Sequence, residues 1–157
     1  MSFRLPVDAD NYFGQIWNNK STNINFRYKF DYYYLCLIIG LNSRKISSAD
    51  KVDAKDLVDN YPGDYIKLAD VIAGLLIDAE IERLAIDPND RDSIESLILE
   101  LIDHQSVTRL SSNGMDQLNL YAARGLDIIN EKIARTKQLE VFLAHYHNLL
   151  NEENCEI

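Results

Sequence analysis

Apolar residues recur at three- and four-residue spacing along most of the chain, which is the pattern of amphipathic helices. Seven helical segments are predicted. The first runs from the N-cap Asp8 through Trp17, the second covers residues 30–42, and a short acidic one follows residues 47–50 through Val58. The longest runs from its cap Asp64 through Arg83, and the last three run from Asp90 or Asp92 through Ile102, over residues 114–133 and over residues 138–150. The fold class we predict is all-α, a single-domain bundle of six or seven helices over residues 1–150, followed by a flexible tail at residues 151–157.

One stretch, residues 24–30, alternates between apolar and polar side chains. Two structures fit this pattern: a short strand or extended N-terminal arm, and a loop that leads into the next helix. The sequence leaves both open.

Two runs, residues 34–39 and 71–77, are apolar on every side of their helices. We expect the second run to lie in the core, and the first to be either a buried central helix or a wide docking surface. Gly125 stands in the middle of a predicted helix, where glycine costs up to about 1 kcal/mol relative to alanine. It therefore predicts a tight helix crossing or a break.

The net charge of −9 is distributed unevenly. Residues 1–47 carry +3, residues 48–106 carry −10 and residues 107–157 carry −2. Such an acidic chain is not suited to broad binding of nucleic acid, although a local basic patch at the N-terminus is compatible with it.

The remaining composition points to the cytoplasm. The two cysteines, Cys36 and Cys155, have no metal-ligand spacing and are expected to be free thiols. Residues 2–11 lack the basic start and apolar stretch of a signal peptide, and the apolar runs are too short to span a bilayer. We expect no membrane contact.

Candidate chemistry is sparse. Glu100 and His104 have the i, i+4 spacing of two metal ligands, but no third ligand accompanies them. His145 and His147 point to different sides of a helix, and Cys36 lies in the most apolar run of the chain. We therefore predict no catalytic residue, no metal and no cofactor.

Ten of the fifteen aromatic residues lie in the first 34 positions, among most of the local positive charge. Aromatic and Arg residues are favoured interface anchors. This predicts a non-catalytic adaptor or assembly subunit that binds a larger protein or a second copy of itself. The predicted partner-binding residues are Trp17, Arg27, Tyr28, Lys29, Tyr32 and Tyr33.

Two other functions stay open. The same basic aromatic segment would also suit stacking on bases and contacting phosphates in a nucleic-acid-associated subunit. Alternatively, carboxylates recurring through the acidic region could imitate DNA phosphates; they are Asp50, Asp53, Asp56, Asp59, Asp64 and Asp70.

Two blocks, residues 30–41 and 114–122, resemble patterns in small accessory subunits encoded in bacterial DNA-modification and anti-phage gene clusters. The resemblance covers structural motifs and implies no catalytic residue. It implies a non-catalytic component that works beside an ATPase or a nuclease.

Overall fold

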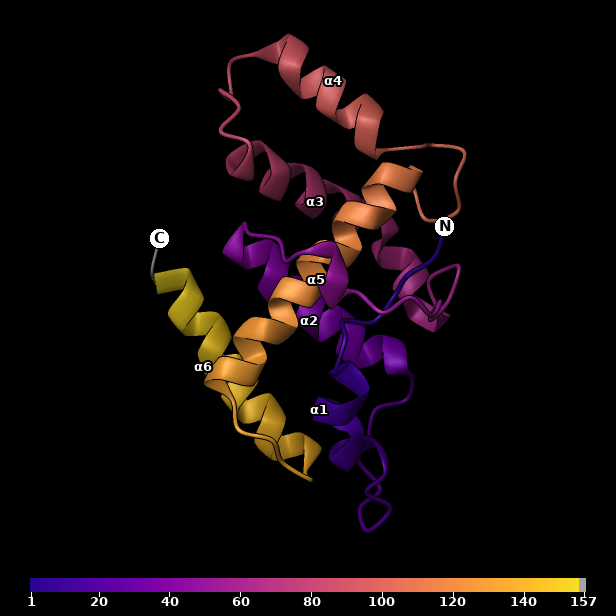
Figure 1. Cartoon of the computed structure of the whole chain (residues 1–157), viewed down its shortest axis with the longest axis vertical. Coiled ribbons are helices and arrows are strands. Elements are labelled where there is room, and N and C mark those ends of the chain that lie inside the picture. Colours follow the sequence, from indigo (N-terminus) through magenta and orange to yellow (C-terminus); the bar gives the residue numbers. More distant parts are fainter. Residues whose placement is uncertain (156–157) are drawn as a thin grey trace.

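The computed structural model describes residues 1–155 of the chain and the side chains of residues 1–152. This part forms six α-helices and two short 3-10 helices, with no β-pairing beyond isolated bridges (Figure 1). The elements are α1 (Ala9–Trp17), α2 (Lys29–Ser43), η1 (Ala49–Lys51), η2 (Gly63–Leu68), α3 (Ala69–Arg83), α4 (Arg91–Leu101), α5 (Ser112–Lys132) and α6 (Leu139–Cys155). The predicted all-α, single-domain bundle is confirmed.

α2 and α5 cross in direct backbone contact at the centre of the bundle. A Cβ atom added to Gly125 would collide with the carbonyl oxygen of Cys36, and one added to Gly40 would collide with that of Tyr121. Glycines at such a point allow two helix backbones to approach closely. Gly125 therefore marks a tight crossing, and the apolar run at residues 34–39 belongs to the buried central helix.

The first seven residues run extended beside residues 51–58. The Phe3 N–H donates to the Val58 carbonyl at 2.9 Å, the Phe3 carbonyl accepts from the Leu57 N–H at 2.8 Å, and the Leu5 carbonyl accepts from the Asp53 N–H at 2.9 Å. The short acidic helix predicted here is wrong, because only η1 is helical. A short isolated helix is costly to nucleate, whereas pairing with the N-terminal segment satisfies the same backbone groups.

Residues 18–28 form the loop between α1 and α2, so the predicted strand at residues 24–30 is wrong and the loop alternative is confirmed. The Asp31 carboxylate accepts hydrogen bonds from the backbone N–H groups of Arg27 and Tyr28, both at 2.8 Å. This cap ends the loop and starts α2 at Lys29. The extended part of the N-terminal region is residues 1–7 instead.

α3 is shorter and more exposed than predicted. η2 precedes it, so α3 has 15 residues, and α5 with 21 is the longest described helix. Ile72 and Leu76 are buried, but Val71 is 55% exposed and Leu75 is 38% exposed. The run at residues 71–77 is therefore only partly core, because α2 and α5 occupy the centre and α3 covers one flank (Figure 1).

The last three helices begin within two residues of their predicted starts. Asp90 caps α4 by accepting a hydrogen bond from the Ser93 N–H at 3.2 Å, and Ser111 caps α5 by accepting from the Gly114 N–H at 3.0 Å. α6 continues to Cys155, into the segment predicted as a tail. Residues 156–157 and the Cys155 side chain lie outside the described residues.

Candidate functional site

Two of the six predicted partner-binding residues lie inside the core: Tyr32 is 1% exposed and Tyr33 is 0% exposed. The Tyr32 ring stacks on Phe13 of α1 with 4.7 Å between centroids, and Phe3 packs on Tyr33. The Tyr33 hydroxyl donates to Asn119 Oδ1 at 2.8 Å. Placing Tyr32 and Tyr33 on a binding surface is therefore wrong, because α2 is covered on both sides here.

The other four predicted residues remain at the surface. Trp17 and Tyr28 are half-buried, and Arg27 is exposed. The Arg27 guanidinium lies 5.3 Å from the Tyr28 ring centroid, and Lys29 Nζ lies 6.0 Å from that of Trp17. Lys29 also forms a solvent-exposed ion pair with Asp10 at 3.1 Å, which offsets part of its charge.

Two of the five other cations of residues 1–47, Arg4 and Arg44, are also paired. Arg4 Nε lies 3.0 Å from an Asp56 carboxylate oxygen, and Arg44 binds both Asp78 and Glu82 at 2.9 Å. These three acids come from the acidic region at residues 48–106. The positive patch expected from the sequence is therefore reduced by pairing between distant segments.

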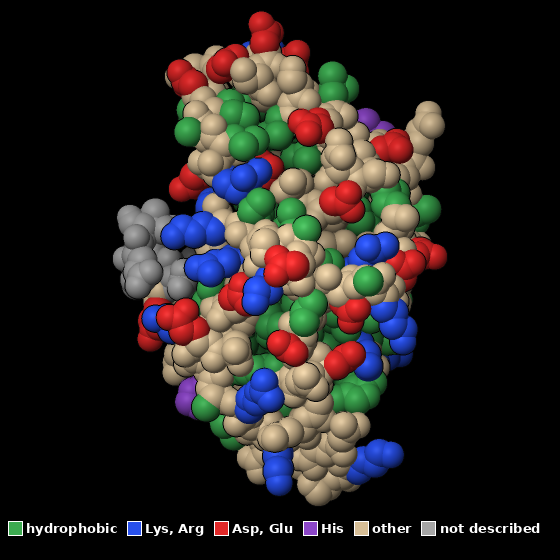
Figure 2. All heavy atoms as spheres, in the orientation of Figure 1, with side chains coloured by type: hydrophobic (Ala, Val, Ile, Leu, Met, Phe, Trp, Pro, Cys, Tyr) green, Lys and Arg blue, Asp and Glu red, His purple; other side chains and the backbone are tan. Residues whose placement is uncertain are grey.

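Four of the nine Lys and Arg residues without a carboxylate partner among the described residues lie where the α1–α2 loop meets the α5–α6 connection. We call this surface the basic end and define it by Lys20, Lys132, Arg135 and Lys137. Asn19 Nδ2 donates to the Lys137 carbonyl at 2.7 Å, which holds the two segments together. Figure 2 shows Lys and Arg side chains at the lower tip of the molecule, where the α1–α2 loop lies in Figure 1.

Tyr12 fixes the α5–α6 connection to α1. Its hydroxyl donates to the Ile133 carbonyl at 2.7 Å, and the Arg135 guanidinium lies 5.8 Å from its ring centroid. Burial raises the pKa of Tyr12 to about 12, although the Arg135 charge opposes this, so the hydroxyl remains a donor at neutral pH. The segment that carries Arg135 is thus positioned before any partner binds.

Residues 20–24, all exposed, form the tip of the α1–α2 loop, which we call the loop tip. Asn25 Nδ2 closes its base by donating to the carbonyls of Trp17 at 3.1 Å and Asn19 at 3.3 Å. Ile24 at the tip is 54% exposed. The basic end therefore has an apolar side chain close to its Lys20.

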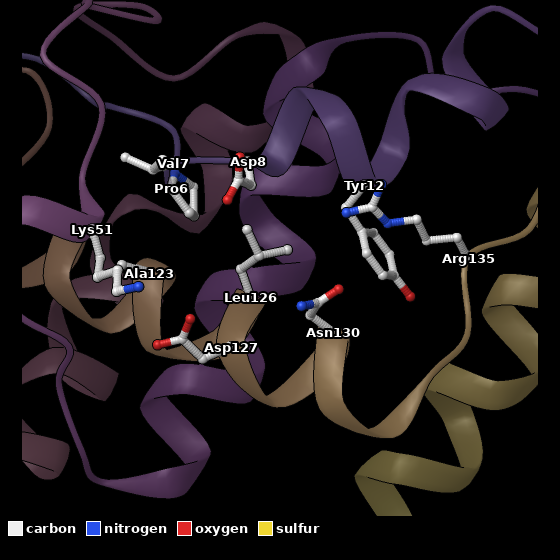
Figure 3. A pocket seen from close by; sticks show the side chains of 10 residues that line it. All are labelled: Pro6, Val7, Asp8, Tyr12, Lys51, Ala123, Leu126, Asp127, Asn130 and Arg135. Atoms are coloured by element: carbon white, nitrogen blue, oxygen red, sulfur yellow. The ribbon is translucent and has the colours of Figure 1, made fainter.

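A polar cavity of about 80 Å³ lies beside the basic end (Figure 3). It is lined by Pro6, Val7, Asp8, Tyr12, Lys51, Ala123, Leu126, Asp127, Asn130 and Arg135. Figure 3 shows Lys51 and Arg135 on opposite sides, with Asp127 and Asn130 between them. The space suits two or three water molecules, and the lining contains no Ser, Cys or His that could act as a nucleophile or base. This cavity is a small polar gap between segments.

Two buried ionisable groups have structural roles. Burial raises the pKa of the Cys36 thiol, which keeps it neutral and unreactive. Burial alone would also raise the pKa of Glu80, but hydrogen bonds from Arg83 and Tyr121, with the Arg83 charge, lower it below its ordinary value. The Tyr121 hydroxyl donates to Glu80 at 2.6 Å and so joins α3 to α5.

No group of three or more His, Cys, Asp or Glu side chains that could hold a metal ion occurs among the residues that were searched, those the structure describes. Glu100 lies in the last turn of α4, which ends at Leu101, and His104 follows in the loop, so the predicted i, i+4 geometry does not form. His145 and His147 are exposed on α6.

Comparison of the chain with protein-family models, with curated proteins and with solved structures finds no match. None of the described helices is long and apolar enough to cross a membrane. The sequence contains one signal that could have located the basic end: residues 132–137 hold three cations and no acid. Their approach to Lys20 depends on the fold.

Proposed function

We propose that this chain is a non-catalytic adaptor or assembly subunit of the cytoplasm, and that its basic end docks on an acidic surface of a larger protein subunit. The observation that carries the proposal is the meeting of Lys20, Lys132, Arg135 and Lys137 at one end of an otherwise acidic molecule. Charges of one sign on a small patch steer a partner of the opposite sign and fix its orientation.

Local geometry supports this proposal. Hydrogen bonds from Asn19 and Tyr12 hold the α5–α6 connection in place, so little ordering is needed when a partner binds. Half-buried Trp17 lies at the base of the loop tip and offers an aromatic anchor beside the cations. The resemblance to accessory subunits of anti-phage gene clusters favours an ATPase or a nuclease as the larger partner.

A nucleic-acid-associated subunit is the second candidate, because the same four cations could contact phosphates. The ion pairs of Arg4, Lys29 and Arg44 reduce the positive surface available for it. DNA mimicry has less support, since several carboxylates of the acidic stretch are engaged within the chain. Examples are Asp56 with Arg4, Asp59 with Ser2, Asp64 with Lys67 and Asp70 with Arg109.

Charge reversal tests the proposal. The variant carries Lys132→Glu, Arg135→Glu and Lys137→Glu and serves as bait for affinity capture from the native host at low salt. We expect capture of the larger subunit to fall at least about tenfold, because each reversal replaces an attraction by a repulsion. A matched control reverses Lys45, Lys55 and Lys67, which changes the net charge equally at scattered positions.

The outcomes separate the candidates. Loss of capture by the first variant alone supports the adaptor function, and equal capture by both variants contradicts it. A titration with duplex DNA at low salt is the second arm. Salt-sensitive DNA binding that disappears in the first variant would favour the nucleic-acid candidate instead.

A further inference from the structure

The end of the molecule opposite the basic end is acidic. α3, α4 and the loop between them form a hairpin that projects from the bundle, and we call it the acidic hairpin (Figure 1). Only Leu97 and Leu101 of α4 are buried. The exposed acids of the hairpin and its flanks are Asp78, Glu82, Asp87, Asp90, Asp92, Glu95, Glu100 and Asp103. Figure 2 shows Asp and Glu side chains concentrated at this upper end.

An open groove runs between the α3–α4 loop and α4. Its lining residues are Leu84, Ile86, Asp92, Ser93, Ser96, Leu97 and Glu100. Leu84 is 46% exposed and Ile86 is half-buried, so the groove has an accessible apolar floor. Asp92 and Glu100 are exposed carboxylates along it. This combination suits an apolar side chain that is flanked by cations.

The loop tip presents such a group. Ile24 is 54% exposed, it lies in the same five-residue tip as Lys20, and the Asn19–Lys137 hydrogen bond brings Lys137 to the base of that tip. The loop tip and the groove lie at opposite ends of the long axis in Figure 1, so they cannot meet within one chain. Two copies can bring them together.

We infer that the chain assembles head to tail, with the loop tip of one copy seated in the acidic groove of the next. This inference rests on the proposed function: it adds the acidic groove of a second copy as an acidic surface that the basic end recognises, and the terminal copy of an open assembly keeps its basic end free for the larger subunit. Ile24 covers Leu84 and Ile86, while Lys20 and Lys137 face Asp92 and Glu100. Because different patches meet, only the two end copies of an open assembly keep a free patch, and the assembly grows until it closes into a ring or continues as a filament.

A mixing experiment tests this geometry. Ile24→Asp blocks the loop tip and leaves the groove intact, whereas Leu84→Asp blocks the groove and leaves the loop tip intact. Both side chains are exposed, so circular dichroism should show both variants folded. In light scattering at low salt, we expect the unaltered chain to form concentration-dependent oligomers and each variant to be a monomer. Association should weaken at least about tenfold in each.

An equimolar mixture of the two variants should form a one-to-one dimer and grow no further, because only one compatible pair of patches remains. A symmetric interface between identical patches would not recover on mixing. Leu99→Asp is the matched control, since Leu99 is 81% exposed on α4 and lies outside the groove. It should leave assembly unchanged, and high salt should weaken assembly of the unaltered chain.

Three results would overturn the inference: an unaltered chain that stays monomeric, oligomers that survive both Ile24→Asp and Leu84→Asp, or a mixture of the two variants that stays monomeric. Failure of the proposed function can be distinguished from failure of this inference. If the unaltered chain is monomeric while the basic-end reversal still abolishes capture of a larger subunit, head-to-tail assembly fails and the adaptor function stands. If the reversal changes neither capture nor assembly, the adaptor function fails as well.

Discussion

The runs at residues 34–39 of α2 and 71–77 of α3 are both apolar on all sides, yet they have different environments. Cys36, Leu37 and Ile39 of α2 are 0% exposed, whereas Val71 and Leu75 of α3 are 55% and 38% exposed. The difference lies in the facing helix. α2 meets α5 at backbone contact, while α3 lies on the flank as part of the acidic hairpin. An all-round apolar run thus shows that a helix is able to occupy the centre of the bundle. Whether it does depends on a second helix with a complementary surface.

The largest expected effect is at the α2–α5 crossing. Gly125→Ala should lower the free energy of unfolding by about 3 kcal/mol or more, because its Cβ would collide with backbone atoms that cannot rotate away. Urea denaturation followed by circular dichroism measures this change. A loss below about 1 kcal/mol would mean that the two helices separate at little cost and that the crossing is not the rigid part.

A smaller effect is expected where the acidic hairpin joins the core. Glu80→Gln should cost about 1–3 kcal/mol, since Arg83 loses its carboxylate while the Tyr121 hydroxyl keeps an acceptor. Arg83 is partly exposed, which limits the loss. Urea denaturation at neutral pH gives the value. An unchanged stability would show that this contact does not hold the hairpin.

The same contact has a defined pH dependence. The pKa of Glu80 lies below its ordinary value of 4.5 in the folded chain, so its stabilisation is complete above 4.5 and is lost as the pH falls through the folded pKa. The stability difference between the unaltered chain and Glu80→Gln should therefore shrink in acid. Paired urea titrations at neutral and strongly acidic pH check this, and a constant difference would contradict it.

Within the acidic hairpin, a glycine-to-alanine substitution should stabilise the fold, in contrast to Gly125→Ala in the core. No atom lies within 4 Å of a Cβ added to Gly74 on the exposed face of α3. Gly74→Ala should raise the free energy of unfolding by about 0.5–1 kcal/mol, because alanine is the better helix former. A thermal unfolding midpoint that falls would show that this face is covered in solution.

The smallest effect concerns the groove. Leu84→Asp should change the stability of the single chain by no more than about 0.5 kcal/mol, since the side chain is already 46% exposed. Urea denaturation at low protein concentration, where single chains dominate, measures it. A large loss would place Leu84 in the core and remove it as a docking residue.

Much of the helical framework follows from local sequence. The cap Asp90 and the special role of the mid-helix Gly125 could be predicted from the sequence, because caps and glycines act over a few residues. The conformation of residues 52–58 could not be predicted from the sequence. Their hydrogen bonds go to Phe3 and Leu5, about 50 residues away.

The candidate site divides in the same way. The sequence by itself determined that aromatic residues and cations concentrate near the N-terminus and that residues 132–137 form a basic segment. Only the tertiary structure decided that Tyr32 and Tyr33 are core and that Arg4 and Arg44 are paired. It also decided that Lys20 joins the basic segment. Periodicity reports which face of a helix is apolar, but burial and ion pairing depend on which distant segment comes to lie against that face.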